Sequence, residues 1–167
     1  MGAWHAVNHL LELGHRKIGI LFNNRSMSSD VQRASCYGKA LERIGVPFNK
    51  ELAILMDKKD ITDEEIIEAL KFELTDLFTI DLLASRLIKI ASKMGIEIPK
   101  DLSVVGFDDI PLSRVLVPAM KTIRQQAEKM GREGVRILID KIQGCKTLTQ
   151  RVLGISLVVR DSNASPN

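Results

Sequence analysis

Short apolar runs along this chain alternate with longer segments in which apolar residues recur every three or four positions. The runs have the length of buried strands: Ile18 to Phe22, Leu52 to Met56, Leu77 to Ile80 and Leu102 to Phe107. Segments before and between the runs have helical spacing, and glycines follow them at Gly14, Gly45 and Gly95. This alternation with short connections predicts an α/β fold, a three-layer α-β-α arrangement around a mostly parallel sheet.

Local signals place the boundaries of two predicted helices. Thr62 and Glu65 have the spacing of a capping box, so we expect a helix to begin there. The segment from Asn23 to Asp30 is polar and turn-like, so we expect the helix that carries Ala34 and Leu41 to begin after it.

The last third of the chain departs from the alternation. Pro111 and Pro118 bracket a predicted loop, and Met120 to Ile123 predicts a short strand. Residues 127–142 have the pattern of a long amphipathic helix. Apolar residues then alternate with other residues from Leu153 to Val159, which predicts a final strand.

Composition narrows the class of protein. Hydrophobic residues make up 45% of the chain and charged residues 27%, ordinary shares for a soluble globular domain. A net charge of +3 is too small to predict the basic surface by which proteins bind nucleic acid. No apolar run has membrane-spanning length and no signal peptide is present, so we expect a cytoplasmic protein without a membrane partner. The first residues enter a helical pattern at once, and we expect the chain to come from a longer protein.

Polar residues gather where the predicted strands end, which is where open parallel sheets bind ligands. They are Asn23 and Asn24, Asp57, Asp81, and Asp108 with Asp109, joined by Ser28, Ser29 and Arg33 at the mouth of the second helix. Carboxylates accept hydrogen bonds from vicinal hydroxyls, and a guanidinium donates two in parallel, so this rim suits a polyhydroxylated ligand. Each residue alone is also ordinary in caps and turns, so the prediction depends on their concentration at one edge.

Other chemistry is weakly represented. His5 and His9 have helical spacing, but no third ligand is evident, so we expect no metal site. The glycine-rich nucleotide loops and the nucleophile elbow are absent, so we expect neither a cofactor nor an enzyme. One enzymatic alternative stays open: Asp108 and Asp109 with Asp57 or Asp81 holding Mg²⁺ for phosphotransfer, with Lys58 or Lys59 near the phosphate.

Several ordered strings resemble motifs of the lactose- and galactose-repressor family of transcription regulators. They are AVNHLLELGHRKI (6–18), RASCYGKALERIG (33–45), GIEIP (95–99), LSVVGFDD (102–109), AMKTIRQQAEKMG (119–131) and LVVRDS (157–162). The family's effector module has two α/β lobes of the periplasmic-binding-protein type, joined by three crossing strands, and a helix-turn-helix precedes it. The resemblance implies that residues 3–124 are the C-terminal effector-binding lobe, 125–145 a crossover and helix of the N-terminal lobe, and 146–167 a returning strand and tail. It also implies that the helix-turn-helix is absent.

The resemblance also implies ligand contacts. Arg33 matches the family's effector-binding arginine, and Ser29 the polar residue one turn before it. Asp108 matches the acidic residue that holds sugar hydroxyls, and Gln125 a polar residue at the crossover beside the cleft. The family's usual asparagine after the third strand is replaced by Ile80, which can neither donate nor accept a hydrogen bond. A ligand less polar than a common hexose, an atypical ligand, or the absence of any ligand fits this departure.

These observations predict the effector-binding part of a regulator that senses a sugar or small metabolite. A ligand would close two lobes and change the spacing of DNA-reading domains across a homodimer, so DNA contact depends on the missing domain. Because most of one lobe is missing, we expect weak or undetectable sugar binding, and self-association through the exposed helix. The alternative is a periplasmic-type sugar-binding protein of a transporter.

Overall fold

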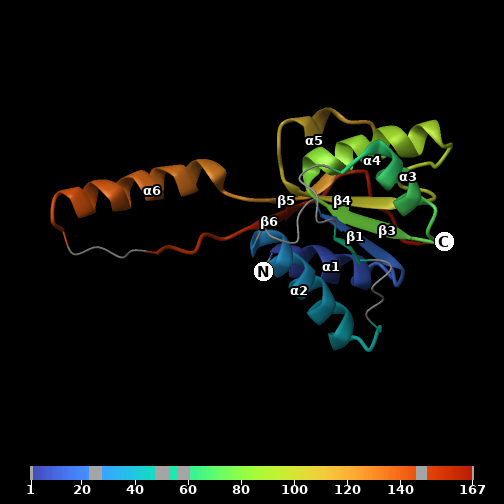
Figure 1. The fold of residues 1–167 in the computed structure, drawn as a ribbon, viewed down its shortest axis with the longest axis horizontal. Coiled ribbons are helices and arrows are strands. Elements are labelled where there is room, and N and C mark those ends of the chain that lie inside the picture. Colours follow the sequence, from blue (N-terminus) through green and yellow to red (C-terminus); the bar gives the residue numbers. More distant parts are fainter. Residues whose placement is uncertain (1, 23–27, 48–52, 56–60, 146–149, 167) are drawn as a thin grey trace.

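The computed structural model describes residues 2–22, 28–47, 53–55, 61–145 and 150–166. In this part of the chain the strands form one sheet in the order β2-β1-β3-β4-β5-β6 (Figure 1). The strands are β1 (Ile18–Phe22), β2 (Ala53–Leu55), β3 (Asp76–Thr79), β4 (Ser103–Asp108), β5 (Lys121–Arg124) and β6 (Ser156–Val158). Strands β1 to β5 pair in parallel, and β6 is antiparallel to β5. The prediction of a mostly parallel α/β sheet is confirmed.

Helices cover both faces of the sheet (Figure 1). Helices α1 (Gly2–Glu12) and α2 (Ser28–Arg43) pack with β1, β3, β4 and β5 in one apolar cluster. Helices α3 (Asp63–Leu70) and α4 (Asp81–Lys93) pack on the other face in a second cluster, beside the short helix α5 (Leu112–Val115). The strands of the middle layer are buried on both faces, which explains their nearly continuous apolar sequences.

The local sequence signals account for the ends of several helices. The Thr62 hydroxyl accepts a hydrogen bond from the Glu65 N–H at 3.3 Å, and the Glu65 carboxylate accepts one from the Thr62 N–H at 2.9 Å, so the predicted capping box is confirmed. Gly14 and Gly95 have φ angles of 100° and 78° just past α1 and α4, a conformation that glycine adopts without a steric penalty.

Three expected boundaries were wrong. The segment between Pro111 and Pro118 contains α5, because the Ser113 and Arg114 N–H groups bond back to Ile110 and Pro111. The final strand is only Ser156–Val158, because its partner β5 offers a ladder of only four residues. The polar segment expected to stay outside the second helix ends early, since α2 already begins at Ser28.

Helix α6 (Ala127–Ile142) lies apart from the sheet, and the chain returns from it alongside the helix into β6 (Figure 1). None of its residues is buried. Arg151 of the returning segment forms an ion pair with Glu133 of α6, with 3.0 Å between Nη1 and Oε2. Several large apolar side chains of α6 are therefore exposed: Met130, Val135, Leu138, Ile139 and Ile142.

The C-terminal tail crosses the amino ends of β3, β4 and β5. The Ser162 hydroxyl accepts from the Lys121 N–H at 2.9 Å and donates to the Val104 carbonyl at 2.6 Å. The Lys121 ammonium donates to Asn163 at 2.9 Å, and Asn163 donates to Asp76 at 2.7 Å. The tail therefore ties together strands at the edge opposite the candidate site. Among the described residues, no helix has both the length and the apolar composition needed to cross a bilayer.

Candidate functional site

The candidate site lies at the carboxyl ends of β4 and β5. Asp108 ends β4 and pairs in register with Arg124, the last residue of β5. The Gln125 side-chain amide donates a hydrogen bond to the Asp108 carboxylate across this pair of strands. Two residues that the resemblance singled out are therefore in direct contact, although 17 positions separate them.

Arg33 reaches the same edge from α2. Its guanidinium pairs with Asp30 one turn earlier, with 2.7 Å between Nη1 and Oδ1, and both side chains are largely buried. The guanidinium carbon also lies 4.4 Å from the centroid of the Phe107 ring. A cation over an aromatic face is attracted by the ring's quadrupole, so Phe107 and Asp30 together fix the direction of the arginine.

A pocket of about 360 Å³ collects these side chains. Ser29, Arg33 and Gln125 line it, and Phe107 forms part of its wall. The sequence analysis missed other residues that line it, among them Gln32, Cys36 and Lys39, and also the role of Phe107. The feature of the sequence that could have revealed these three residues is their helical spacing from Ser29 and Arg33. That spacing places them near the same face of α2. The pocket has the size of a small-molecule site and is open on one side.

Asp81 lies just after the carboxyl end of β3, as expected, but its carboxylate is engaged within the protein. It is fully buried, and its two carboxylate oxygens accept from the Thr122 hydroxyl at 2.5 Å and from the Ile110 N–H at 2.9 Å. Burial raises its pKa, against the opposing effect of these hydrogen bonds. A buried carboxylate with both oxygens engaged is not available to a ligand, so the structure gives Asp81 a supporting role under the site in place of the expected contact.

Asp57 lies outside the described residues, as do Asn23, Asn24, Lys58 and Lys59. Within the described ranges, no three His, Cys, Asp or Glu side chains are grouped so that they could hold a metal ion. Asp109, the other carboxylate of the Mg²⁺ alternative, is occupied by arginines.

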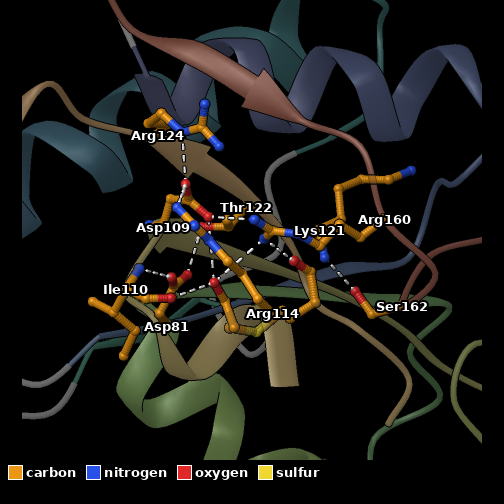
Figure 2. Close-up of polar contacts among 11 residues, drawn as sticks. Asp81, Asp109, Ile110, Arg114, Lys121, Thr122, Arg124, Arg160 and Ser162 are labelled. Atoms are coloured by element: carbon orange, nitrogen blue, oxygen red, sulfur yellow. Dashed lines mark hydrogen bonds and ion pairs between the residues drawn. The ribbon is translucent and has the colours of Figure 1, made fainter. Parts of the chain in front are cut away.

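Arg124 and Arg160 each pair with Asp109 at 2.6 Å, and Arg114 approaches it at 3.4 Å (Figure 2). Burial opposes the charge of this carboxylate, but the hydrogen bonds and charges of Arg160 and Arg124 outweigh burial and hold its pKa below the ordinary value. Asp109 and Arg160 both occur in strings that carry the family resemblance, which is the signal that could have paired them.

Ile80 packs between the two apolar clusters as a half-buried residue at the start of α4. It occupies the N-cap position and, as an isoleucine, makes no side-chain cap hydrogen bond. The residue that replaces the family's usual asparagine therefore contributes apolar contacts to the core beneath the rim.

The fold and the site define a periplasmic binding protein-like domain, and the chain belongs to that family, whose model matches residues 7–163. Within it, the chain is similar to transcription regulators of the lactose- and galactose-repressor group, so the expected resemblance is confirmed. It is 32% identical over 167 residues to the NTD biosynthesis operon regulator NtdR of Bacillus subtilis, covering 96% of this chain and 50% of that protein. It is 31% identical over 169 residues to the repressor CytR of Escherichia coli K12, covering 96% and 48%. The chain thus spans about half the length of these relatives.

Solved structures agree with this assignment. A regulator from Enterococcus faecium with bound ribose matches with a TM-score of 0.88 and 26% identity, over 99% of this chain and 63% of that one. A CelR–cellobiose complex matches at 0.86 and 29%, over 97% and 51%. The dimeric Lac repressor with a C-terminal deletion matches at 0.88 and 27%, over 99% and 62%.

Proposed function

We propose that this chain is the effector-binding part of a bacterial transcription regulator that senses a sugar or a related small metabolite. The observation that carries the proposal is the pocket at the carboxyl edge of the sheet, where Ser29, Arg33 and Gln125 meet beside Asp108. Relatives of the same family that bind ribose and cellobiose support the ligand class. The pocket is a binding site in this proposal, and the protein acts without catalysis.

Each side chain has a distinct part in the proposed recognition. The Asp108 carboxylate accepts hydrogen bonds from ligand hydroxyls, and the guanidinium of Arg33 donates to ligand oxygens. Gln125 already donates to Asp108 and has a carbonyl oxygen to offer to a hydroxyl. Ser29 adds a small hydroxyl at the start of α2. Phe107 supplies an apolar wall, which suits the carbon face of a sugar ring.

The proposal assigns residues 3–124 to the C-terminal lobe, 125–145 to a crossover and a helix of a second lobe, and 146–167 to the returning strand and tail. The exposed apolar side chains of α6 support this assignment, because they are typical of a surface that packs against further protein. Ligand would then close the two lobes, and a separate helix-turn-helix domain would contact DNA in the cytoplasm.

The regulator acts as a homodimer in this proposal. Three apolar side chains are exposed by 61%, 73% and 91%: Leu82 on α4, Val115 at the end of α5 and Val117 just after it. The likeness to the dimeric Lac repressor supports a paired arrangement. The transporter alternative is not favoured, because the relatives described above are transcription regulators.

A titration of the chain with ribose and with cellobiose, followed by amide NMR, tests the proposed function. We expect the largest shifts at Ser29, Arg33, Phe107, Asp108 and Gln125, with millimolar affinity because only part of a cleft is present. The matched control for ribose is its mirror image, L-ribose, which should leave these amides unmoved. Absence of any shift with both sugars would contradict the ligand class, and micromolar affinity would contradict the assignment of a second lobe.

A further inference from the structure

Asp109 collects arginines from separate segments of the chain (Figure 2). Arg160 donates to one carboxylate oxygen at 2.6 Å, and Arg124 donates to the other at 2.6 Å. Arg114 of α5 reaches the second oxygen at 3.4 Å. The carboxylate is 1% exposed and Arg160 is 13% exposed, so this ion pair is shielded from water and from salt.

The backbone beside this carboxylate has an unusual conformation. Asp108 and Asp109 have φ angles of 120° and 56°, values that residues with a side chain rarely adopt. Such a turn persists only where its surroundings hold it. The Asp109 N–H donates to the Thr122 hydroxyl at 3.3 Å, and the Ile110 N–H donates to Asp81 at 2.9 Å.

The same turn is tied to the strands that lead to and from α6. Asp109 pairs with Arg124, and its neighbour Asp108 accepts from Gln125, so two adjacent residues at the end of β4 hold two adjacent residues at the end of β5. Arg124 is also the register partner of Ser156 in β6. Arg160 follows β6 by two residues. The segment that leads to α6 and the segment that returns from it therefore each contribute an arginine that donates to Asp109.

We infer that Asp109 is a positioning residue for the ligand pocket: through Arg124 and Arg160 it sets the contact between Asp108 and Gln125 and joins that contact to both connections of α6. The inference rests on the proposed function for its link to a ligand. Its structural content, the dependence of the Asp108–Gln125 contact on Asp109, holds with or without a ligand.

Side-chain NMR of unliganded protein tests this dependence. The Gln125 amide resonance is recorded in the wild-type chain and in Asp108→Ala, which lacks the acceptor and marks the position of a free amide. We expect Asp109→Asn and Arg124→Gln to move the resonance from the wild-type position toward the Asp108→Ala position. Arg132→Gln is the matched control, because it breaks an exposed ion pair with Glu128 on α6 by the same chemical change.

A purely structural role predicts another result. In that case Asp109→Asn lowers the unfolding midpoint and leaves the Gln125 resonance at its wild-type position, which would overturn the inference. Arg124 is 47% exposed, and Arg124→Gln leaves the Asp109 carboxylate paired with Arg160, so this variant keeps the test decisive if Asp109→Asn fails to fold.

A ribose titration separates this inference from the proposed function. If ribose shifts the pocket amides of the wild-type chain, Asp109→Asn should weaken its binding by about tenfold, the loss expected for one misplaced hydrogen bond. Unchanged ribose affinity in Asp109→Asn would count against the inference. If ribose leaves the wild-type chain unmoved, the proposed function is contradicted for this sugar, while the Gln125 resonance still decides the role of Asp109.

Discussion

Arg33 lies over the ring of Phe107, with 4.4 Å between the guanidinium carbon and the ring centroid. The two residues come from α2 and β4, and Phe107 directly precedes Asp108 at the end of its strand. This contact presents a donor of fixed direction to the pocket, held further by the ion pair with Asp30.

A substitution of Arg33 that keeps its positive charge should show whether the planar shape of the guanidinium contributes to ribose binding. Arg33→Lys keeps the positive charge but loses the planar group that stacks on Phe107 and donates two parallel hydrogen bonds, so we expect ribose affinity to fall by about tenfold or more. The NMR titration measures the effect. Lys39→Arg is a control in the same pocket, and an Arg33→Lys chain with wild-type ribose affinity would show that the guanidinium has no special part in recognition.

Gly106 allows a test of the close approach between β4 and the Asp81 side chain. A Cβ atom built there would lie 2.0 Å from the Asp81 carboxylate and 3.1 Å from the Met120 side chain. Gly106→Ala must therefore displace the buried carboxylate that holds Thr122 and Ile110, and we expect unfolding free energy to fall by roughly 1–3 kcal/mol. Urea denaturation measures it.

Gly134 on α6 is the matched control for that substitution, because a Cβ there meets nothing within 4 Å. Gly134→Ala should leave the unfolding free energy unchanged or slightly higher, since alanine favours helix. Equal effects of the two substitutions would contradict the close approach of Asp81 to the sheet.

Stability should fall on mild acidification through the histidines near the C-terminal tail. Burial lowers the pKa of His15, against the hydrogen bond that its ring donates to the Ala164 carbonyl, and burial followed by the charge of Lys121 lowers the pKa of His9. Because both pKa values are below that of the unfolded chain, the unfolded chain binds more protons as pH falls. Stability is therefore full above pH 6.5 and is lost as pH falls below it toward the folded-state pKa values.

Thermal unfolding between neutral and mildly acidic pH measures this dependence. His15→Gln should flatten part of the curve, whereas His5→Gln, on the exposed side of α1, should leave its slope unchanged. A curve whose slope His15→Gln leaves unchanged would contradict the burial of this ring.

The apolar face of α6 should promote self-association of the chain at high concentration. Leu138 and Ile142 are 58% and 77% exposed, and exposed apolar patches favour contact with other protein. We expect a mass above that of the monomer by light scattering, and we expect Leu138→Lys with Ile142→Lys to reduce it. A wild-type monomer at all concentrations would contradict this expectation.

Local rules predicted most of the fold but only part of the site. The capping box at Thr62 and the buried strand of β4 depend on residues close in sequence, so spacing and apolar character were enough. The hydrogen bonds of Asp81 could not be predicted, because its partner Thr122 is 41 positions away and because its carboxylate lies against Gly106 of another strand. The pairing of Arg33 with Phe107 likewise depends on two elements that meet only in the folded sheet.

Strands β5 and β6 pair in antiparallel orientation, so the α6 segment is a long insertion in the connection of a β-hairpin. Arg124 and Ser156 face each other in register, so the chain leaves the sheet and re-enters it at neighbouring points. A short turn could join these two residues directly and leave the sheet order intact. The α6 segment is therefore exchangeable: a different insert could be grafted between residues 124 and 156, and the sheet would serve as its scaffold.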